Sequence, residues 1–331
     1  MRCYLDDMNG LWVVGDFAWD VLIRTNAPLQ TGGDTYGEVN LAPGGSAANA
    51  AVWARRCGMP TTFVGKVGSD RLGDLAAEDL RAEGVDACLL HSDGYATGSV
   101  AVWIDHTGER SMVSGKGADH YLLPSELPRD QLAAARHLHL SGWSFFANPP
   151  RSAAREAARI AKAGGATLSF DPASFQLIET MGVEPFLSTV TDLGVDFVFP
   201  NYEEGAVLSG ERDPERIVPA LAERMPGTRV ILKLDAKGAR VQDGPTGGVS
   251  IDPVPSRLVD ATGAGDAFAG AFLASWLRSG DAVAAARLAA GVSAWVIERL
   301  GARPKQDAEL HALLEGERRR DVGAAGVEEK T

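Results

Sequence analysis

Asp260-Ala-Thr-Gly-Ala-Gly-Asp266, followed directly by Ala267-Phe268-Ala269-Gly270, is the most informative stretch of this chain. Its glycines and small neighbours leave backbone N–H groups free to converge on an anion at the start of a helix, where the helix dipole also favours negative charge. An acid, Asp266, lies inside this anion site. A carboxylate beside a phosphate is unfavourable unless it removes a proton from a hydroxyl that attacks phosphorus. The pattern indicates phosphoryl transfer, although a tight turn ahead of an ordinary helix would use the same residues.

The composition is that of a globular protein. The chain has 331 residues, of which 45% are hydrophobic and 23% charged, which is enough for one large domain or for one domain with an appendage. A net charge of −12 argues against nucleic acid as the main partner, because phosphate backbones are held by clustered Lys and Arg. We see no membrane-spanning run and no signal peptide, and therefore expect a cytoplasmic protein with no membrane partner. The scattered Cys3, Cys57 and Cys88 fit reduced thiols.

Short apolar runs alternate with helix-like stretches, which predicts a mostly parallel sheet covered by helices. The runs are Leu11–Val14, Thr62–Val64, His137–Leu140, Thr167–Phe170, Phe197–Phe199 and Arg229–Leu232. Polar residues follow them, including Asp16, Asp171, Asn201 and Lys233. Because ligands of open α/β sheets bind beyond the carboxyl ends of the strands, we expect these side chains at one binding edge.

Two stretches depart from this rhythm and predict a second, smaller sheet. Val21–Leu41 and Tyr95–Ser114 carry alternating residues, with a turn at residues 105–108. No crossover helix separates their strands, so we expect a lid with strands at about 18–42 and 95–116 rather than additions to the main sheet. An exposed edge strand invites pairing, which predicts a homodimer formed through the lid.

A second glycine cluster, Pro43-Gly44-Gly45-Ser46-Ala47-Ala48-Asn49, precedes a helix of small residues. Bare backbone at Gly44 and Gly45 allows close approach of a ligand, and Asn49 can both donate and accept hydrogen bonds. A helix cap and a sugar site would both have this pattern. Together with the 260–266 segment, the cluster resembles the two signatures of the ribokinase-like, or PfkB, carbohydrate kinases. The resemblance extends over nearly the whole chain, up to about Ala302.

The resemblance implies a fold and an acceptor site. The fold is a three-layer α/β sandwich with a mostly parallel central sheet and a small β-sheet lid. Carboxylates after the first strand suit a hydroxyl-rich ligand, since each accepts several hydrogen bonds. A dinucleotide site is excluded because the glycines of a G-x-G-x-x-G motif are missing there. The implied acceptor residues are Asp16, Asp20, Gly44, Gly45 and Asn49.

A nucleotide site is implied in the second half of the chain. Asn201-Tyr202-Glu203-Glu204 resembles the family's N-x-x-E motif, in which Asn201 and Glu204 organise Mg2+ and phosphate largely through water. Without the other motifs, an N-capped helix with an acidic first turn would explain these residues. The stretch from Lys233 to Gly238 resembles the segment that closes over the nucleotide, with Lys233 reaching its phosphates. Asp235 departs from the family, which commonly has glycine at this position.

Three further features bear on cofactors and metals. Asp260 and Thr262 match positions that in many members help to hold a monovalent cation such as K+. Arg287–Gly291 replaces a segment that often carries Asn beside adenine, which leaves the nucleotide selectivity open. His137 and His139 share a strand face, but no third ligand at suitable spacing accompanies them, as a zinc site requires.

The implied function is ATP-dependent phosphorylation of a hydroxyl, expected to be primary, of a small sugar or sugar acid. Asp266 would be the general base, and the N–H groups of Gly263, Ala264 and Gly265 would hold the charge on the transferred group. Nucleoside and sugar-phosphate kinases share the scaffold, and Arg110 and Lys116 near the lid could bind an acceptor's phosphate. A sugar-binding sensor without turnover is the alternative from another class, although a sensor would not need the acid.

The resemblance and the composition also divide the chain. We expect one kinase domain over residues 1–315 and a polar, disordered tail over residues 316–331.

Overall fold

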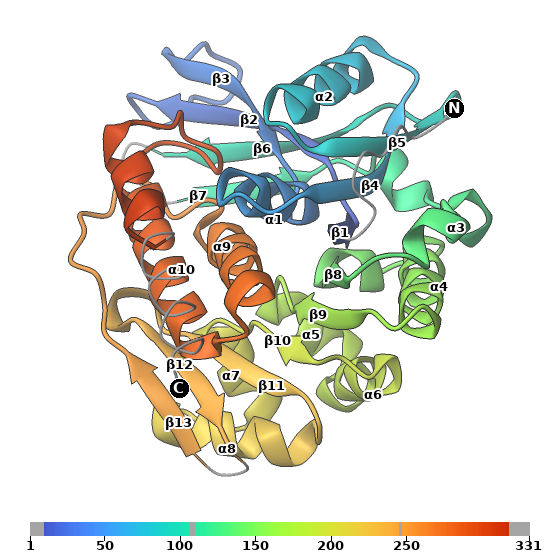
Figure 1. The fold of residues 1–331 in the computed structure, drawn as a ribbon. Coiled ribbons are helices and arrows are strands. Elements are labelled where there is room, and N and C mark those ends of the chain that lie inside the picture. Colours follow the sequence, from blue (N-terminus) through green and yellow to red (C-terminus); the bar gives the residue numbers. More distant parts are fainter. Residues whose placement is uncertain (1–9, 106–109, 245–246, 318–331) are drawn as a thin grey trace.

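The computed structural model describes residues 10–105, 110–244 and 247–317. Its main sheet has nine strands in the order β13-β12-β11-β10-β9-β8-β1-β4-β5 (Figure 1). Neighbouring strands from β11 to β5 pair in parallel, whereas β12 and β13 extend one edge in antiparallel fashion. The strands are β1 (Leu11–Val14), β4 (Thr61–Gly68), β5 (Asp86–Ser92), β8 (His137–Ser141), β9 (Thr167–Asp171), β10 (Phe197–Val198), β11 (Arg229–Lys233), β12 (Ala239–Asp243) and β13 (Gly247–Ile251).

Helices cover both faces of this sheet, because successive residues of a buried strand point to opposite sides. In β1, Leu11 and Val13 belong to one hydrophobic core, whereas Trp12 and Val14 belong to the other. The helices of the first core are α1 (Ser46–Arg56), α2 (Arg71–Ala82), α9 (Ala264–Ser279) and α10 (Ala282–Ile297). Those of the second are α4 (Pro150–Ala163), α5 (Phe175–Met181), α6 (Val183–Leu193), α7 (Tyr202–Ser209) and α8 (Pro214–Arg224). The predicted three-layer α/β fold is confirmed.

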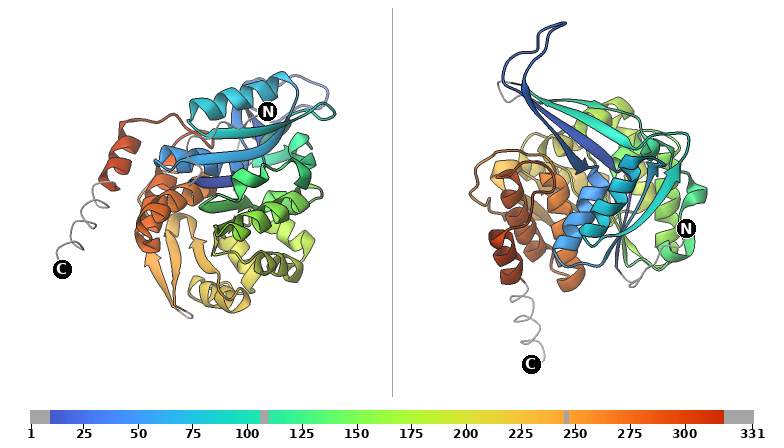
Figure 2. Two further views of the ribbon diagram at one scale, coloured as in Figure 1. Left: turned by 45° about the vertical axis from the view of Figure 1, so that its right-hand side comes forward. Right: turned by 90° about the horizontal axis from the view of Figure 1, so that it is seen from above.

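A separate four-stranded sheet has the order β3-β2-β6-β7. It consists of β2 (Ala18–Thr25), β3 (Gly37–Gly44), β6 (Gly98–Ile104) and β7 (Arg110–Ser114). The right-hand view of Figure 2 shows the β2–β3 hairpin projecting from the body of the molecule. The predicted small second sheet is therefore present, while most of the expected turn between β6 and β7 lies outside the described residues. Since β3 ends at Gly44, this smaller sheet runs directly into the second glycine cluster.

The chain continues beyond α10 into a helical stretch over residues 308–317, whose Leu310 and Leu314 are buried against the first core. The rest of the predicted tail, residues 318–331, lies outside the described residues. None of the helices in the described ranges is both long and apolar enough to cross a membrane.

Candidate active site

The anion loop predicted at residues 260–266 begins α9. Gly263 caps the helix with φ of +74°, and a Cβ added to it would lie 2.5 Å from the Cβ of Ala302. Both the backbone angle and the close packing therefore require glycine. Asp260 fixes the loop, since its carboxylate accepts hydrogen bonds from the Thr262 N–H at 2.9 Å and hydroxyl at 2.6 Å and from the Gly301 N–H at 2.9 Å. The Ala264 N–H lies 3.3 Å from the carbonyl oxygen of Ala261, a long hydrogen bond.

Asp266 lies in the first turn of α9 and is partly exposed, so a ligand can reach it. Removal from water raises its pKa from 3.8 to about 7, and the negative charges of Asp171 and Asp16 act in the same direction. A hydrogen bond of 2.8 Å from Asn49 Nδ2 to Asp266 Oδ2 and the ammonium of Lys233 oppose this shift. A carboxyl group with its pKa near neutrality is suited to accept a proton.

We expect the Asp266→Asn variant to be more stable than the wild type at pH 8, by about 1–2 kcal/mol after allowance for partial exposure. A carboxyl whose folded-state pKa is raised binds its proton more tightly when folded. Its contribution to stability is therefore fully present below about pH 4 and is lost as the pH rises through about 7. Urea unfolding between pH 4 and pH 8 measures this difference. A difference that does not change with pH would contradict the electrostatic account, and Asp243→Asn on an exposed strand end is the control.

The predicted acceptor residues surround the start of α1. The carboxylate of Asp16 accepts the N–H groups of Ser46 at 2.7 Å and Ala47 at 3.3 Å. A Cβ on Gly44 would lie 2.5 Å from Oδ2 of Asp20, so glycine at this position makes room for the carboxylate. Burial raises the pKa of Asp20 to about 6, against the opposing charge of Arg303. Gly45 precedes α1 with φ of +88°, a backbone conformation that favours glycine.

Two of the predicted nucleotide residues, Asn201 and Lys233, are neighbours in a parallel β-bridge. Asn201 and Glu204 form a reciprocal capping box at the start of α7, with both hydrogen bonds at 2.9 Å. The helix-cap interpretation is therefore correct locally. The cap uses one carboxylate oxygen of Glu204, which accepts the Asn201 N–H. Lys233 pairs with Asp171 at 2.7 Å, and both residues are buried. A Cβ on Gly265 would lie 3.1 Å from Lys233 Nζ, so the ammonium lies beside the anion loop.

Charge in this region is unbalanced. Burial raises the pKa of Glu204 to about 7, and the negative charge of Asp171 raises it further. Burial alone would lower the pKa of Lys233, but Asp171 and Glu204 more than compensate and raise it, so the ammonium stays charged. Carboxylates thus outnumber ammonium groups around Lys233. Such an excess of negative charge fits a cation.

The backbone angle of Asp235, in the segment after β11, bears on the aspartate that stands where glycine was expected. Asp235 is exposed and has φ of +50°, in the left-handed region that glycine adopts at low cost. Gly238 has φ of +85°, and a Cβ there would lie 2.0 Å from the carbonyl oxygen of Ile251. Asp235 thus adopts a backbone angle that glycine adopts more easily, which fits the glycine that the resemblance leads us to expect at this position.

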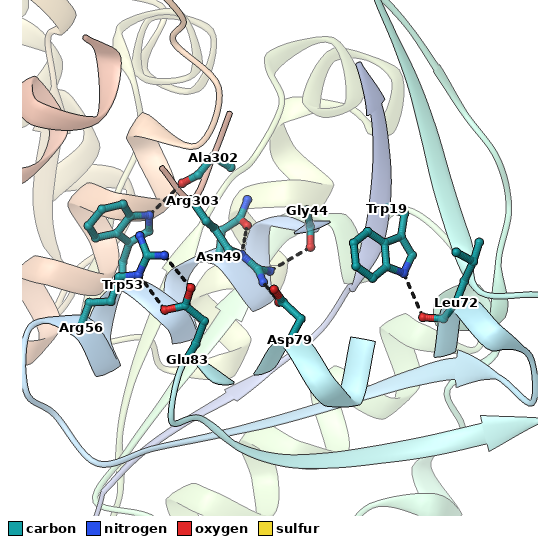
Figure 3. Close-up of polar contacts among 10 residues, drawn as sticks. All are labelled: Trp19, Gly44, Asn49, Trp53, Arg56, Leu72, Asp79, Glu83, Ala302 and Arg303. Atoms are coloured by element: carbon teal, nitrogen blue, oxygen red, sulfur yellow. Dashed lines mark hydrogen bonds and ion pairs between the residues drawn. The ribbon is translucent and has the colours of Figure 1, made fainter. Parts of the chain in front are cut away.

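From the sequence we missed Asp119 and Arg303 near the site. We placed Asp171 at the binding edge but gave it no specific role. Asp119, whose pKa burial raises to about 7, is influenced by the charge of Asp16, and its Oδ1 is buried without a hydrogen-bond partner among the described residues. Arg303 donates from Nε to Asn49 Oδ1 at 2.7 Å across 254 residues of sequence (Figure 3). No local sequence pattern marks Arg303.

Other residues singled out from the sequence lie elsewhere or in plain structural roles. His137 and His139 are buried in β8, where their ring nitrogens share hydrogen bonds with hydroxyls of β9 at 2.7–2.8 Å. Burial lowers the pKa of each imidazole, to about 3 and about 4, so both are neutral. Lys116 is exposed, and the side chain of Arg110 lies outside the described residues.

The fold and this arrangement of loops define a ribokinase-like kinase. A model of the pfkB family carbohydrate kinases matches residues 8–309, and the chain belongs to this family. A fructokinase from Klebsiella pneumoniae is 33% identical over 82% of this chain and 86% of its own length. An ATP-dependent ribose-1-phosphate kinase from Halopiger xanaduensis is 31% identical over 92% of this chain and 97% of its own length. An E. coli protein assigned as a ribokinase II, solved with ATP and Mg2+, superposes with a TM-score of 0.81 at 26% identity, over 94% of this chain and 99% of its own. The predicted family and enzyme class are confirmed.

Proposed function

We propose that this carbohydrate kinase transfers the γ-phosphate of ATP to a primary hydroxyl of a small sugar or sugar acid, with Asp266 as general base. The observation that carries the proposal is the position of Asp266. It begins a helix beside the anion loop, is held by Asn49 of the second glycine cluster, and has its pKa raised to about 7 by burial. Asp266 can accept the hydroxyl proton as the oxygen attacks phosphorus in line, while the N–H groups of Gly263, Ala264 and Gly265 hold the transferred phosphoryl group.

The acceptor is assigned to Asp16, Asp20, Gly44, Gly45 and Asn49. The two carboxylates offer acceptors for sugar hydroxyls, and the glycines allow the sugar to approach the backbone. The titratable neighbours of Asp16 are largely acidic, since Asp20 and Asp119 interact electrostatically with it. The nearby cation Arg303 is engaged with protein groups. This charge distribution favours a neutral sugar over a sugar acid or a sugar phosphate.

The nucleotide is assigned to Lys233, Asp235 and Gly238, with Asn201 and Glu204 organising Mg2+. Within the described ranges, no group of three or more His, Cys, Asp and Glu side chains is placed to hold a metal ion by itself. That finding fits a cation held through water and phosphate, and the excess of carboxylates around Lys233 fits its charge. Bound Mg2+ would screen the remaining phosphate charge. Asp260 and Thr262 are the residues we assign to a monovalent cation such as K+.

A coupled assay for ADP release tests the proposal. We expect turnover with a neutral sugar such as D-fructose or D-ribose, and rates at least about tenfold lower with gluconate, ribose 1-phosphate and adenosine, because an uncompensated charge or a poorly oriented acceptor loses transition-state binding. Turnover confined to ribose 1-phosphate or adenosine would favour the corresponding alternative kinase. Binding by calorimetry without ADP from any acceptor would favour the sugar sensor.

We also propose that the protein is a cytoplasmic homodimer joined through the lid. Apolar side chains exposed on the lid support this assembly, because a sheet surface that would be costly to leave in water is a candidate interface. They include Val39 and Leu41 of β3 and Val113 of β7, which share one face in the pairing register.

A further inference from the structure

The segment Gly301–Pro304 connects the anion loop with the second glycine cluster. The Gly301 N–H donates to Asp260 of the anion loop at 2.9 Å. Two side chains of α1 bind the carbonyl oxygens that follow: Trp53 Nε1 donates to Ala302 and Arg56 to Pro304, both at 2.9 Å. Figure 3 shows this segment lying against α1, with Arg303 pointing toward Asn49.

Arg303 uses each part of its guanidinium group. Nε donates to Asn49 Oδ1 at 2.7 Å, one terminal nitrogen pairs with Asp79 at 2.6 Å, and the other donates to the carbonyl oxygen of Gly44 at 3.1 Å. The group also lies over the ring of Phe17, 5.7 Å from its centroid. With its side chain only 2% exposed, Arg303 is held in one orientation. Each of its three nitrogens donates to a protein group, which uses three of the five N–H donors.

The orientation of the Asn49 amide follows from this contact. A guanidinium group has donors and no acceptor, so the amide must present its oxygen, Oδ1, to Arg303. Its nitrogen must then point the other way, where Nδ2 donates to Asp266 Oδ2 at 2.8 Å. The four residues Asp79, Arg303, Asn49 and Asp266 form a continuous hydrogen-bonded chain that ends on the proposed base.

We propose that Arg303 is a positioning residue: it fixes the Asn49 amide so that this amide donates a hydrogen bond to the base, Asp266. The inference rests on the proposed role of Asp266 in proton removal. A donated hydrogen bond favours an ionised carboxylate. An amide free to rotate could instead turn its oxygen toward a protonated Asp266 and stabilise the inactive acid. Arg303 prevents that rotation and keeps more of Asp266 ionised.

Other charged groups also act on Asp266. Asp171 and Asp16 raise its pKa and Lys233 lowers it, and Arg303 itself interacts with it through space. A test must therefore separate the relay through Asn49 from the direct field of the guanidinium. Two matched variants in the same region make this separation possible.

The first measurement needs neither sugar nor ATP. In the full-length protein labelled with 13C at the aspartate carboxyl carbons, the resonance absent from Asp266→Asn identifies Asp266, and a pH titration gives its pKa. We expect Arg303→Met to raise this pKa by about one unit. Asp79 keeps 23% of its side chain exposed and can be hydrated when its partner is removed.

Arg56→Met is the matched control. Arg56 is equally enclosed, pairs with Glu83 and holds the same segment through Pro304, but it does not contact Asn49. We expect it to lower stability without moving the pKa of Asp266. Equal shifts in the two variants, or no shift in Arg303→Met, would overturn the proposal. If Arg303→Met does not fold, Arg303→Lys serves instead. It keeps the positive charge but loses the planar guanidinium group, and should raise the pKa of Asp266 by a smaller amount.

A double variant tests the route through Asn49. Asn49→Leu removes the relay, so adding Arg303→Met to it should shift the pKa by less than Arg303→Met does alone. Fully additive shifts would show that Arg303 acts through its field only. If the assay panel yields an active acceptor, the acid limb of the kcat/KM profile should shift to higher pH in Arg303→Met. The value of kcat/KM should then approach that of the wild type near about pH 9. An equal decrease of kcat/KM at every pH would indicate a structural role for Arg303 instead.

Discussion

Asp266→Asn should lower kcat by about 10^2- to 10^4-fold while leaving ATP binding nearly unchanged. The magnitude is that of general base catalysis, since the amide cannot accept the proton of the attacking hydroxyl. The substitution is isosteric, and the amide oxygen can still accept the hydrogen bond from Asn49 Nδ2. ADP release measured with the best acceptor of the panel gives the rate, and calorimetry gives the affinity for ATP.

Asp243→Asn, on the exposed end of β12, is the control for the loss of one negative charge. It should keep the rate of the wild type. Near-normal turnover of Asp266→Asn would remove the residue from the mechanism and with it the proposed function. Together with the expected gain in stability at pH 8, a loss of activity would show that this carboxylate is kept at a cost to the fold.

Lys233→Met should destabilise the protein by about 3–5 kcal/mol and weaken the apparent affinity for ATP, because breaking a buried ion pair leaves an uncompensated charge. The variant leaves Asp171 and Glu204 facing each other without the ammonium that now separates their charges. It also removes the cation beside Gly265, where we place the transferred phosphate. Urea unfolding gives the stability, and the dependence of rate on ATP concentration gives KM.

The two effects can be separated. Lys233→Met combined with Asp171→Leu removes both charges of the pair and should regain much of the stability without regaining the affinity for ATP. Lys305→Met, at an exposed position outside the nucleotide segment, should change neither property. Lys233→Met with the stability and KM of the wild type would contradict both assignments of this lysine.

The central strands could be predicted from sequence because they are buried on both faces. β1 and most of β9 consist of apolar or small residues, and β8 alternates buried His and Leu; the predicted and observed ranges of all three agree within a residue. β5, β12 and β13 were missed. They occupy the two edges of the sheet, where exposed residues interrupt the apolar pattern. Their place is set by pairing with a neighbouring strand, which a local pattern does not reveal.

By itself, the sequence determined the class of fold, the family and the loop that carries the proposed base. These features are local: the positive φ of Gly263 and of Gly45 and the start of each following helix are set by residues within a few positions. Only the tertiary structure decided which side chains act on Asp266. Lys233 and Asp171 are 62 residues apart, and Asn49 lies 217 residues from Asp266 and 254 from Arg303. Such contacts depend on strand order and helix packing, and the buried hydrogen bonds that join them have no counterpart in the local sequence.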